Sequence, residues 1–315
     1  MPCHLDLDEQ ILFQQYPKVL HTLLIDHTTG GNILWATDDY LEQGGAFAPD
    51  REITVDLITG KYRGLVKPRI EKSREAQLKR TKGKAEVFTP SWVCNCQNNL
   101  VDEAWFSRKD VFNIEGPKSW KATKEPIAFS ANNKNKSWQK YVDENRMEIT
   151  CGEAPYLVSR YDTVSGEPIE LSERIGLLDR KLRVVGENCS TEKDWLKWAR
   201  RAVESIYGFE FQGDSLLLAR ENILMSYQDY REAALGTLAQ GKELLAIAKV
   251  ISWNIWQMDG LTQLPPYKKA EAQQLSLFDL KDDSKQKSQL CLIRDWRAKE
   301  TLTFQSLLNK EGSTP

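Results

Sequence analysis

The stretch IYGFEFQGDSLLLARENIL, residues 206–224, places a strand and a helix on either side of a short turn. YGFEF predicts the strand. DSLLLARENIL predicts the helix, with Asp214 or Ser215 as its N-cap. A strand that leads into a helix is typical of parallel sheets whose strands are joined by crossover helices. This stretch therefore favours an α/β fold.

The segments on either side continue the alternation. Two further strands are expected, in RMEIT at 146–150 and in SWNIWQMDGL at 252–261, each followed by a turn. Three further helices are expected, in RIGLLDRKLRVV at 174–185, after Thr191, and in KELLAIAKVI at 242–251. Thr191 and Asp194 resemble a capping box, and an apolar stripe follows them. The second half of the chain therefore predicts a parallel sheet with crossover helices.

The first half predicts smaller elements. A helical pattern runs from Asp8 to about Asp26, and Pro17 is expected to begin a second helix there. NILWAT at 32–37 and EITVDLIT at 52–59 predict two strands. Thr89-Pro90 predicts the start of a helix, whose apolar face is expected to contain Trp92, Val93, Cys96, Leu100 and Val101. Residues 113–137 are polar and predict an exposed loop.

These patterns divide the chain into four parts. We expect an N-terminal α+β extension with a basic segment (1–84), an α/β core (85–261), a polar linker (262–289), and a C-terminal strand LCLIRDW with a tail (290–315). The basic segment, from Lys61 to Lys84, has ten Lys or Arg residues and only two Glu. Such a run is typical of a solvated face, and it is also what a nucleic acid backbone would select.

Composition limits the function classes. Hydrophobic residues make up 41% and charged residues 28%, and the formal net charge is −2, all ordinary for a soluble globular protein. The six cysteines form no CxxC pair and there are three histidines, so we expect no metal site and no disulfide framework. No apolar run approaches membrane-spanning length, and the acidic start MPCHLDLDEQ does not suit a signal peptide. We therefore expect a cytoplasmic protein.

Three of the predicted strands end near an acidic residue. Glu148 precedes the turn at Gly152, Glu210 ends YGFEF, and Asp259 follows NIWQM. Ligands of parallel sheets bind at the carboxyl ends of the strands, and a carboxylate after the second strand can accept hydrogen bonds from both hydroxyls of a ribose. The order of the three acids therefore predicts a site for a ribose-containing cofactor.

Four elements together resemble a known family, the S-adenosylmethionine-dependent DNA adenine amino-methyltransferases of restriction-modification systems. They are AEVFTP at 85–90, EITCGEAPY at 148–156, YGFEF with LARENIL at 207–224, and NIWQMDGL at 254–261. The amino-acid sequence of these elements is also similar to that of restriction endonuclease subunit M, a methylase subunit. The resemblance implies a Rossmann-like methyltransferase sheet, S-adenosylmethionine as cofactor, DNA as substrate and methyl transfer to the amine of adenine without a metal.

The resemblance also implies roles for individual residues. Phe88, Thr89 and Pro90 would contact the methionine part of the cofactor. Glu148, Gly152 and Tyr156 would form the cofactor loop, in which Ala154 stands where the family has a second glycine. Glu210 would hold the ribose, and Asp259 would face the adenine.

The family's catalytic Asn-Pro-Pro-Tyr/Phe motif, which should follow a fourth strand, is degenerate or missing. LPPY occurs at 264–267, too soon after Asp259 for a strand to fit between them. One alternative takes LCLI as the fourth strand, with Asp295 and Trp296 in the catalytic roles. Another takes NILWATDDY as a permuted strand that ends in Asp38, Asp39 and Tyr40. The catalytic residues are thus left open, and the sheet is expected to be truncated or completed by the N-terminal strands or by a partner.

Two other functions stay open from the sequence. The chain is also compatible with a non-catalytic DNA-binding or specificity subunit that works with a restriction-system partner. In addition, QLSLF at 274–278 resembles the peptide with which bacterial proteins dock on the sliding clamp, through Gln274, Leu275, Leu277 and Phe278. The alternative for this peptide is that it packs on the protein's own surface.

Overall fold

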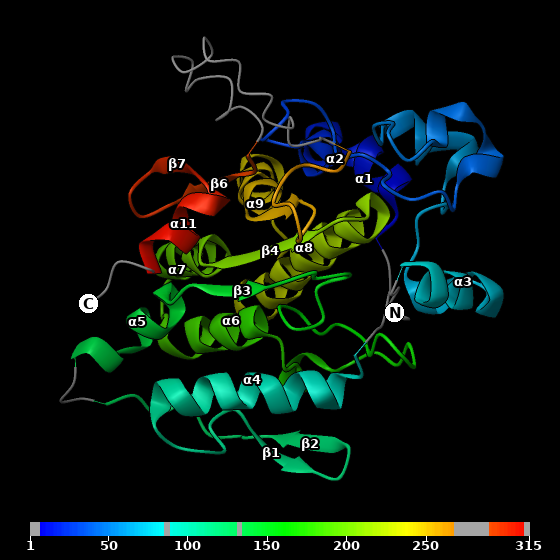
Figure 1. Ribbon diagram of the computed structural model, residues 1–315. Coiled ribbons are helices and arrows are strands. Elements are labelled where there is room, and N and C mark those ends of the chain that lie inside the picture. Colours follow the sequence, from blue (N-terminus) through cyan, green and yellow to red (C-terminus); the bar gives the residue numbers. More distant parts are fainter. Residues whose placement is uncertain (1–6, 85–88, 131–133, 268–289, 312–315) are drawn as a thin grey trace.

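A three-stranded parallel sheet lies at the centre of the protein (Figure 1). The computed structural model describes residues 7–84, 89–130, 134–267 and 290–311. Within them the strands β3 (Arg146–Glu148), β4 (Ile206–Glu210) and β5 (Ile255–Gln257) are ordered β3-β4-β5, and Gly208 pairs with both Glu148 and Ile255. The prediction of an α/β protein with a parallel sheet is confirmed.

Pairs of helices join these strands, as predicted. Helices α6 (Leu177–Asn188) and α7 (Glu192–Glu204) connect β3 to β4, and α8 (Gly213–Leu235) and α9 (Gly241–Asn254) connect β4 to β5. The hydroxyl of Thr191 accepts a hydrogen bond from the N–H of Asp194 (3.1 Å), so the predicted cap of α7 is confirmed. The predicted cap of α8 is wrong. Its N-cap is Gln212, because the Asp214 carboxylate instead binds cations from another segment.

The N-terminal segment is helical where a helix was predicted and irregular where strands were predicted. Helices α1 (Glu9–Gln15) and α2 (Pro17–Leu24) meet at Pro17, as expected. The two predicted strands are wrong: residues 32–59 form isolated bridges and short 3-10 turns. The backbone of Leu34 exchanges hydrogen bonds with the side-chain amide of Gln257 (2.7 and 2.8 Å). The N–H of Gly213 donates to the carbonyl of Trp35 (2.9 Å). A side chain and a helix end thus take the place of a partner strand.

Helix α4 (Ser91–Phe106) begins after Thr89-Pro90 as predicted, but it buries the opposite face from the one expected. Asn95, Asn98 and Asp102 are buried, whereas Leu100 is 64% exposed. The reason is Arg180 of α6, a buried guanidinium that donates to Asp102 (2.6 Å) and to Asn95 (2.9 Å). A buried arginine must have hydrogen-bond partners, and the polar face of α4 supplies them.

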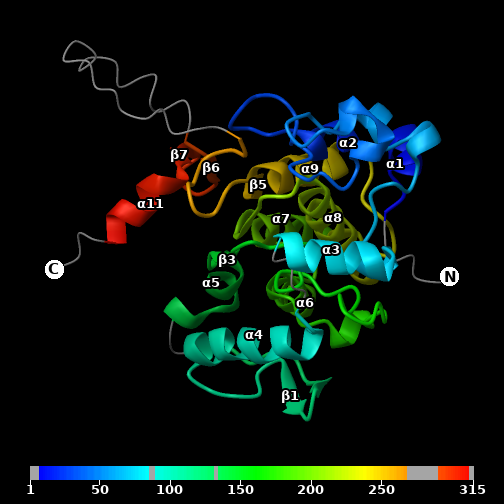
Figure 2. The same ribbon diagram turned by 45° about the vertical axis from the view of Figure 1, so that its right-hand side comes forward.

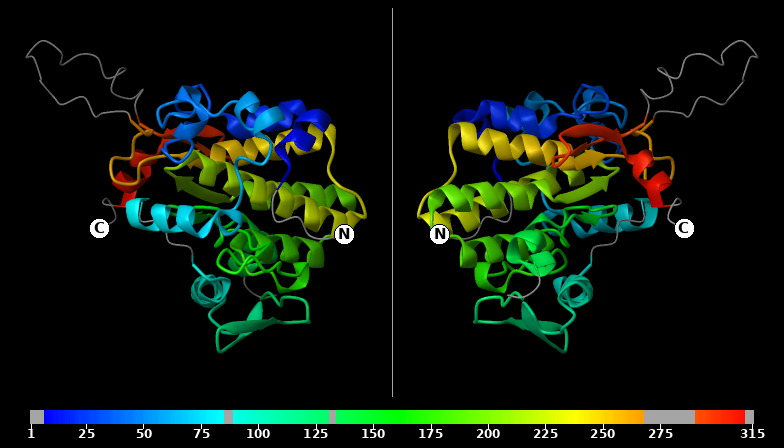
Figure 3. Two further views of the ribbon diagram at one scale, coloured as in Figure 1. Left: turned by 90° about the vertical axis from the view of Figure 1, so that its right-hand side faces the viewer. Right: turned by 90° about the vertical axis from the view of Figure 1, so that its left-hand side faces the viewer.

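The predicted loop at 113–137 is also wrong in part. Strands β1 (Asn113–Gly116) and β2 (Ser119–Ala122) form an antiparallel hairpin beside α4, and α5 (Trp138–Asp143) follows the loop. The hairpin is mostly exposed, so its sequence lacks the alternation of apolar and polar residues that predicts a strand. Figure 3 shows the resulting layers, with α2 and α9 at one end, then α8, α6, and finally α4 with the hairpin.

The C-terminal strand does not extend the central sheet. Strands β6 (Leu292–Asp295) and β7 (Glu300–Thr303) pair with each other, and α11 (Phe304–Glu311) follows. The prediction of LCLI as a fourth parallel strand is therefore wrong. The apolar side chains of this hairpin instead pack on one face of the sheet, in a cluster formed by Phe209, Trp256, Met258, Cys291, Ile293 and Phe304.

The N-terminal helices share the main core with the sheet. One cluster of buried apolar side chains extends along the chain from Leu12 to Ile255. Arg220 of α8 is fully buried and donates to the carbonyls of Ile25 (3.0 Å) and Ile255 (2.8 Å), so it ties the end of α2 to β5. None of the helices in the described part of the chain combines the length and apolar character needed to cross a membrane.

The start of α8 is the point where the N-terminal arm, residues 33–40, contacts the sheet region. A Cβ added at Gly213 would overlap the carbonyl oxygen of Leu34 and lie 3.0 Å from the Ile53 side chain. We expect Gly213→Ala to lower the free energy of unfolding by about 1–3 kcal/mol, because overpacking forces the arm away. Denaturant unfolding measures this. Gly186→Ala in α6 is the matched control, since a Cβ there meets nothing within 4 Å and alanine stabilises helices. Equal effects of the two substitutions would contradict the prediction.

Candidate functional site

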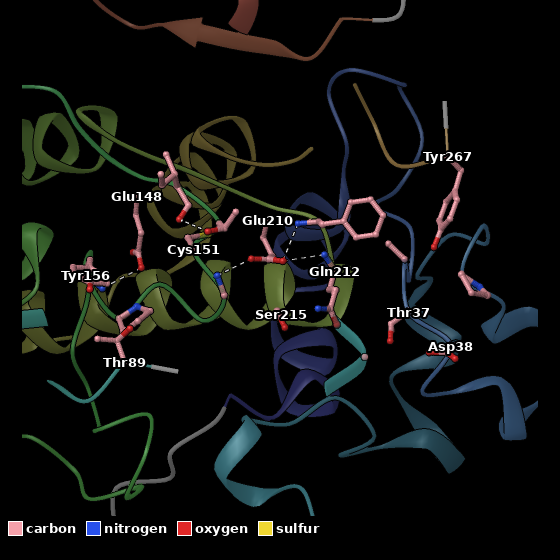
Figure 4. Close-up of a pocket in the computed structure, with 18 residues that line it drawn as sticks. Thr37, Asp38, Thr89, Glu148, Cys151, Tyr156, Glu210, Gln212, Ser215 and Tyr267 are labelled. Atoms are coloured by element: carbon pink, nitrogen blue, oxygen red, sulfur yellow. Dashed lines mark hydrogen bonds between the residues drawn. The ribbon is translucent and has the colours of Figure 1, made fainter. Parts of the chain in front are cut away.

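A cavity of about 840 Å³ opens at the carboxyl ends of β3 and β4 (Figure 4). Five parts of the chain line it: the N-terminal arm with Pro49, the end of the basic segment with Thr89, the loop after β3, the residues after β4, and Tyr267. Its volume lies in the range of small-molecule and cofactor sites, and its place at the strand ends is where parallel sheets bind ligands.

Glu148 stands at the end of β3 with its carboxyl buried in the cavity wall. Its oxygens accept hydrogen bonds from the N–H groups of Tyr156 (3.4 Å) and Leu157 (3.2 Å). Burial raises the pKa of this carboxyl well above its ordinary value of 4.5, the two N–H groups lower it, and nearby Glu210 raises it. A positively charged ligand in the cavity would offset this burial.

The loop after β3 turns sharply into the cavity. Gly152 has a left-handed backbone (φ 54°), and its N–H donates to Oε2 of Glu210 (2.8 Å). Thr150 is also left-handed (φ 48°), which is a rare conformation for a β-branched residue. Gly208 of β4 allows the close approach of this loop, because a Cβ there would lie 3.3 Å from the carbonyl of Glu148 and 3.4 Å from Cys151. Ala154, at the place of the family's second glycine, is buried and left-handed (φ 63°).

Glu210 ends β4 and lies near Glu148 in the wall of the same cavity. Besides the N–H of Gly152, its carboxylate accepts hydrogen bonds from the N–H groups of Phe211 (2.9 Å) and Gln212 (3.2 Å). These three backbone N–H groups fix the position of the carboxylate at the C-terminal end of β4. Only 8% of the residue is exposed, and that part lines the cavity.

The remaining predicted cofactor residues are placed differently. Thr89 and Tyr156 line the cavity, and Tyr156 lies beside Cys94 and Thr89. Pro90 is the N-cap of α4 and is not part of the cavity wall. The side chain of Asp259 caps a turn by accepting from the N–H groups of Leu261 (2.8 Å) and Thr262 (3.3 Å), also outside the wall. Phe88 and the clamp-like peptide with Gln274, Leu275, Leu277 and Phe278 lie outside the described residues.

The cavity also contains residues that the sequence analysis did not assign to the cofactor. Outside the loop after β3 these are Ala36, Thr37, Asp38, Pro49, Gly83, Phe211, Gln212, Ser215 and Tyr267. Two of them belong to patterns that the sequence did show, since Asp38 lies in NILWATDDY and Tyr267 ends LPPY. Asp38 and Tyr267 come together only through long-range packing, so neither motif alone predicts that they line one cavity.

The electrostatic character of the cavity is acidic. Among its described lining residues are Asp38, Glu148 and Glu210, and none is Lys, Arg or His. Groups of His, Cys, Asp and Glu arranged to hold a metal ion do not occur among the described residues. The wall therefore suits a cation of organic character better than a phosphate group.

A buried cluster of charged side chains supports the part of the cavity wall formed by Gln212 and Ser215. Arg80 of α3 (Arg74–Lys84) donates to Asp214 (2.6 and 3.1 Å), Gln212 (2.7 Å) and Ser215 (3.1 Å), so α3 is tied to the first turn of α8 (Figure 2). Lys72 binds the same Asp214 carboxylate (2.9 Å). Two cations of the basic segment are thus used inside the protein, whereas Lys61, Arg74 and Lys82 are exposed.

Comparison of the chain with protein-family models, with curated proteins and with solved structures found no match.

Proposed function

We propose that the cavity binds S-adenosylmethionine and that the protein is a DNA methyltransferase of a restriction-modification or phage-related system, acting on the amine of adenine. The observation that carries this proposal is the pair of carboxyl groups at the ends of two adjacent parallel strands. Glu148 and Glu210 line one cavity with no cation among its described lining residues.

The charge of the cavity discriminates between adenosine cofactors. S-adenosylmethionine carries a sulfonium, an ammonium and a carboxylate group, so its positive groups outnumber its single negative group and are attracted by the acidic wall. Dinucleotides and nucleoside triphosphates carry phosphates, which bind helix N-termini and basic side chains. The loop after β3 leads to turns and not directly to a helix, since α6 begins only at Leu177. The N-terminus of α8 also reaches the wall, but its N–H groups already donate to Glu210, to the carbonyl of Trp35 and to Asp214. A phosphate therefore finds neither a basic side chain among the described lining residues nor free N–H groups at Gln212, Gly213 and Ser215.

Each carboxyl group has a distinct task in this proposal. Glu210, held by three backbone N–H groups, would accept hydrogen bonds from the ribose hydroxyls, and Glu148 would neutralise the ammonium group. The left-handed turn at Gly152 leaves the loop close enough to contact the cofactor. When bound, the cofactor supplies a methyl group on positively charged sulfur. The order β3-β4-β5 supports the further proposal that these strands are half of a Rossmann-like methyltransferase sheet.

Calorimetric titration with S-adenosylmethionine tests the cofactor. We expect binding by the wild type and about tenfold weaker binding by Glu210→Gln, because hydrogen bonds to a charged acceptor contribute about 1.5 kcal/mol or more. Glu192→Gln is the control, since that carboxylate is 65% exposed and outside the cavity. Absence of heat with the wild type at millimolar ligand would refute the proposal.

A second candidate function is a non-catalytic subunit that binds DNA and the cofactor without methyl transfer. It is favoured by the sequence departure at the catalytic motif, where Leu264 stands in place of asparagine. Exposed cations of the basic segment, such as Lys61, Arg74 and Lys82, would contact phosphates in either case. Incubation with unmethylated DNA and cofactor labelled in the methyl group separates the two. Label in DNA supports the enzyme, and cofactor binding without label supports the subunit.

A further inference from the structure

A second cavity, of about 980 Å³, lies at the C-terminal end of α8. Ser215 at the start of this helix lines the first cavity, whereas Tyr230 and Leu235 at its end line the second. Since a helix rises about 1.5 Å per residue, Ser215 and Tyr230 are about 22 Å apart along its axis. The two walls share no described residue, so the second cavity is separate from the proposed cofactor site.

The floor of the second cavity is apolar and belongs to the main core. Leu182 of α6, Trp195 of α7 and Tyr230 of α8 are 1%, 2% and 9% exposed. The ring of Trp195 packs on that of Tyr227, with centroids 5.8 Å apart. A Cβ added at Gly186 of α6, also in the wall, would meet nothing within 4 Å, so the space beside this floor is open. Open space beside a packed apolar floor is typical of small-molecule sites.

Most of the charged side chains in this wall already have partners. Arg183 and Glu187 form an ion pair (2.7 Å). The carboxylate of Glu173 accepts a hydrogen bond from the N–H of the last residue of β2 (2.8 Å). A carboxylate oxygen of Glu192 lies 3.8 Å from the guanidinium of Arg231. These side chains therefore offer a ligand little free charge.

Three other charged side chains of the wall are exposed and have no ion pair or side-chain hydrogen bond within the described part of the chain: Lys121, Lys124 and Glu170. Lys121 belongs to β2 and Lys124 follows that strand, so both cations come from one segment of the wall. Two unpaired positive charges are thus available against one negative charge. The first cavity has no cation among its described lining residues, so the two cavities have opposite electrostatic characters.

This combination selects one class of ligand. Lysine ammonium groups donate hydrogen bonds, and they bind carboxylates and other anions through charge-assisted bonds. An apolar floor favours the burial of an apolar group, because that burial removes apolar surface from water. A small inorganic anion would leave the floor uncovered, and an apolar cation would be repelled by the two lysines.

We propose that the second cavity binds a small amphipathic anion. Its anionic group would lie at Lys121 and Lys124, and its apolar body would cover Leu182, Trp195 and Tyr230. Because the two walls share no described residue, this binding does not depend on the function proposed for the first cavity.

Alkylation of Cys189 measures occupancy, because this half-buried thiol belongs to the wall of the second cavity. The full chain is treated with iodoacetamide, a neutral reagent, with and without decanoate below its micelle concentration. Peptide mass spectrometry then gives the alkylation rate of each cysteine. We expect saturating decanoate to slow the alkylation of Cys189 severalfold. The rate at Cys96, which is also half-buried but lies outside this cavity, should not change.

The charge of the ligand is tested with decyltrimethylammonium, which has the same chain and a positive head group. It should reach half-protection of Cys189 only at about tenfold higher concentration than decanoate, because it is repelled by the lysines. Lys121→Ala combined with Lys124→Ala should raise the decanoate concentration for half-protection about tenfold, through loss of the charged donors. Lys193→Ala is the matched control, since it removes an exposed lysine of α7 outside the wall.

The apolar part of the site is tested with Gly186→Leu, which fills the open space beside the floor. In this variant decanoate should no longer change the alkylation rate of Cys189. Absence of protection in the wild type, equal protection by the two ligands, or protection that is unchanged in the lysine double variant would overturn the proposal. Protection by decanoate that is weakened in the lysine double variant and lost in Gly186→Leu would support it.

Discussion

Replacing Arg80 with methionine is expected to lower the free energy of unfolding by about 3–5 kcal/mol, the usual effect of removing one partner of a buried ion pair. Arg80 and Asp214 are 1% and 0% exposed. Burial alone would raise the pKa of Asp214, but Lys72 and Arg80 hold it well below its ordinary value of 3.8. Two other side-chain partners, Lys72 and the Tyr40 hydroxyl, still contact this buried carboxylate in the variant. Asp39, Gln212 and Ser215 lose a donor at the same time.

Denaturant unfolding measures the loss, and Arg200→Met is the matched control. Arg200 forms an ion pair with Glu204 of the same helix (2.8 Å) and is 49% exposed, so its removal is expected to change stability by less than about 1 kcal/mol. The double variant Arg80→Met with Asp214→Asn should recover part of the loss, because the buried carboxylate is removed together with its arginine. Recovery should be incomplete, because Lys72, whose side chain is 10% exposed, then loses Asp214 as its ion-pair partner. If Arg80→Met costs no more than Arg200→Met, the cluster does not hold α3 in place.

Glu148→Gln is expected to increase stability at neutral pH and to weaken cofactor binding about a hundredfold. The folded protein binds the proton of Glu148 more tightly than the unfolded chain, because burial raises the pKa of this carboxyl. Its contribution to stability is therefore greatest at low pH and decreases as the pH rises from the ordinary value of 4.5 toward the higher pKa of the folded protein. Glutamine carries no charge, so it removes this decrease but also removes the partner of the cofactor's ammonium group.

Two measurements on the same variant check the prediction. The melting temperature of the wild type should decrease more steeply than that of Glu148→Gln as the pH is raised from about 4.5 to about 8. Over the same range the affinity for S-adenosylmethionine should increase in the wild type and stay constant in the variant. Glu192→Gln again serves as the control. Parallel melting curves for the two proteins would mean that Glu148 is solvated and not buried.

The sequence predicted the local elements of the second half well because their signals are short-range. The capping pair Thr191 and Asp194 lies within one turn of helix, and α7 begins there in the structure. Pro17 begins α2 for an equally local reason, since proline fits the first helical position. The acids at the ends of β3 and β4 followed from strand order, and in the structure they line one cavity.

Predictions that depended on distant partners were wrong. The apolar stripe of α4 suggested which face is buried, but Arg180 of α6 required the polar face. The segment 32–37 has the composition of a strand, yet Gln257 and Gly213 take its backbone hydrogen bonds. A pattern within one segment gives no information about the hydrogen-bond needs of a group that lies 78 or more residues away, as Arg180 lies from Asp102.

By itself the sequence determined the α/β class, the parallel strands with their crossover helices, and the order of acidic residues along them. These follow from periodicity and capping, which act over a few residues. Only the tertiary structure decided that Asp38 and Tyr267, 229 positions apart in the chain, line the same cavity as Glu148 and Glu210. The cause is physical: Arg80, Gln257 and Gly213 anchor the N-terminal arm by hydrogen bonds that form only when the sheet and its helices have packed.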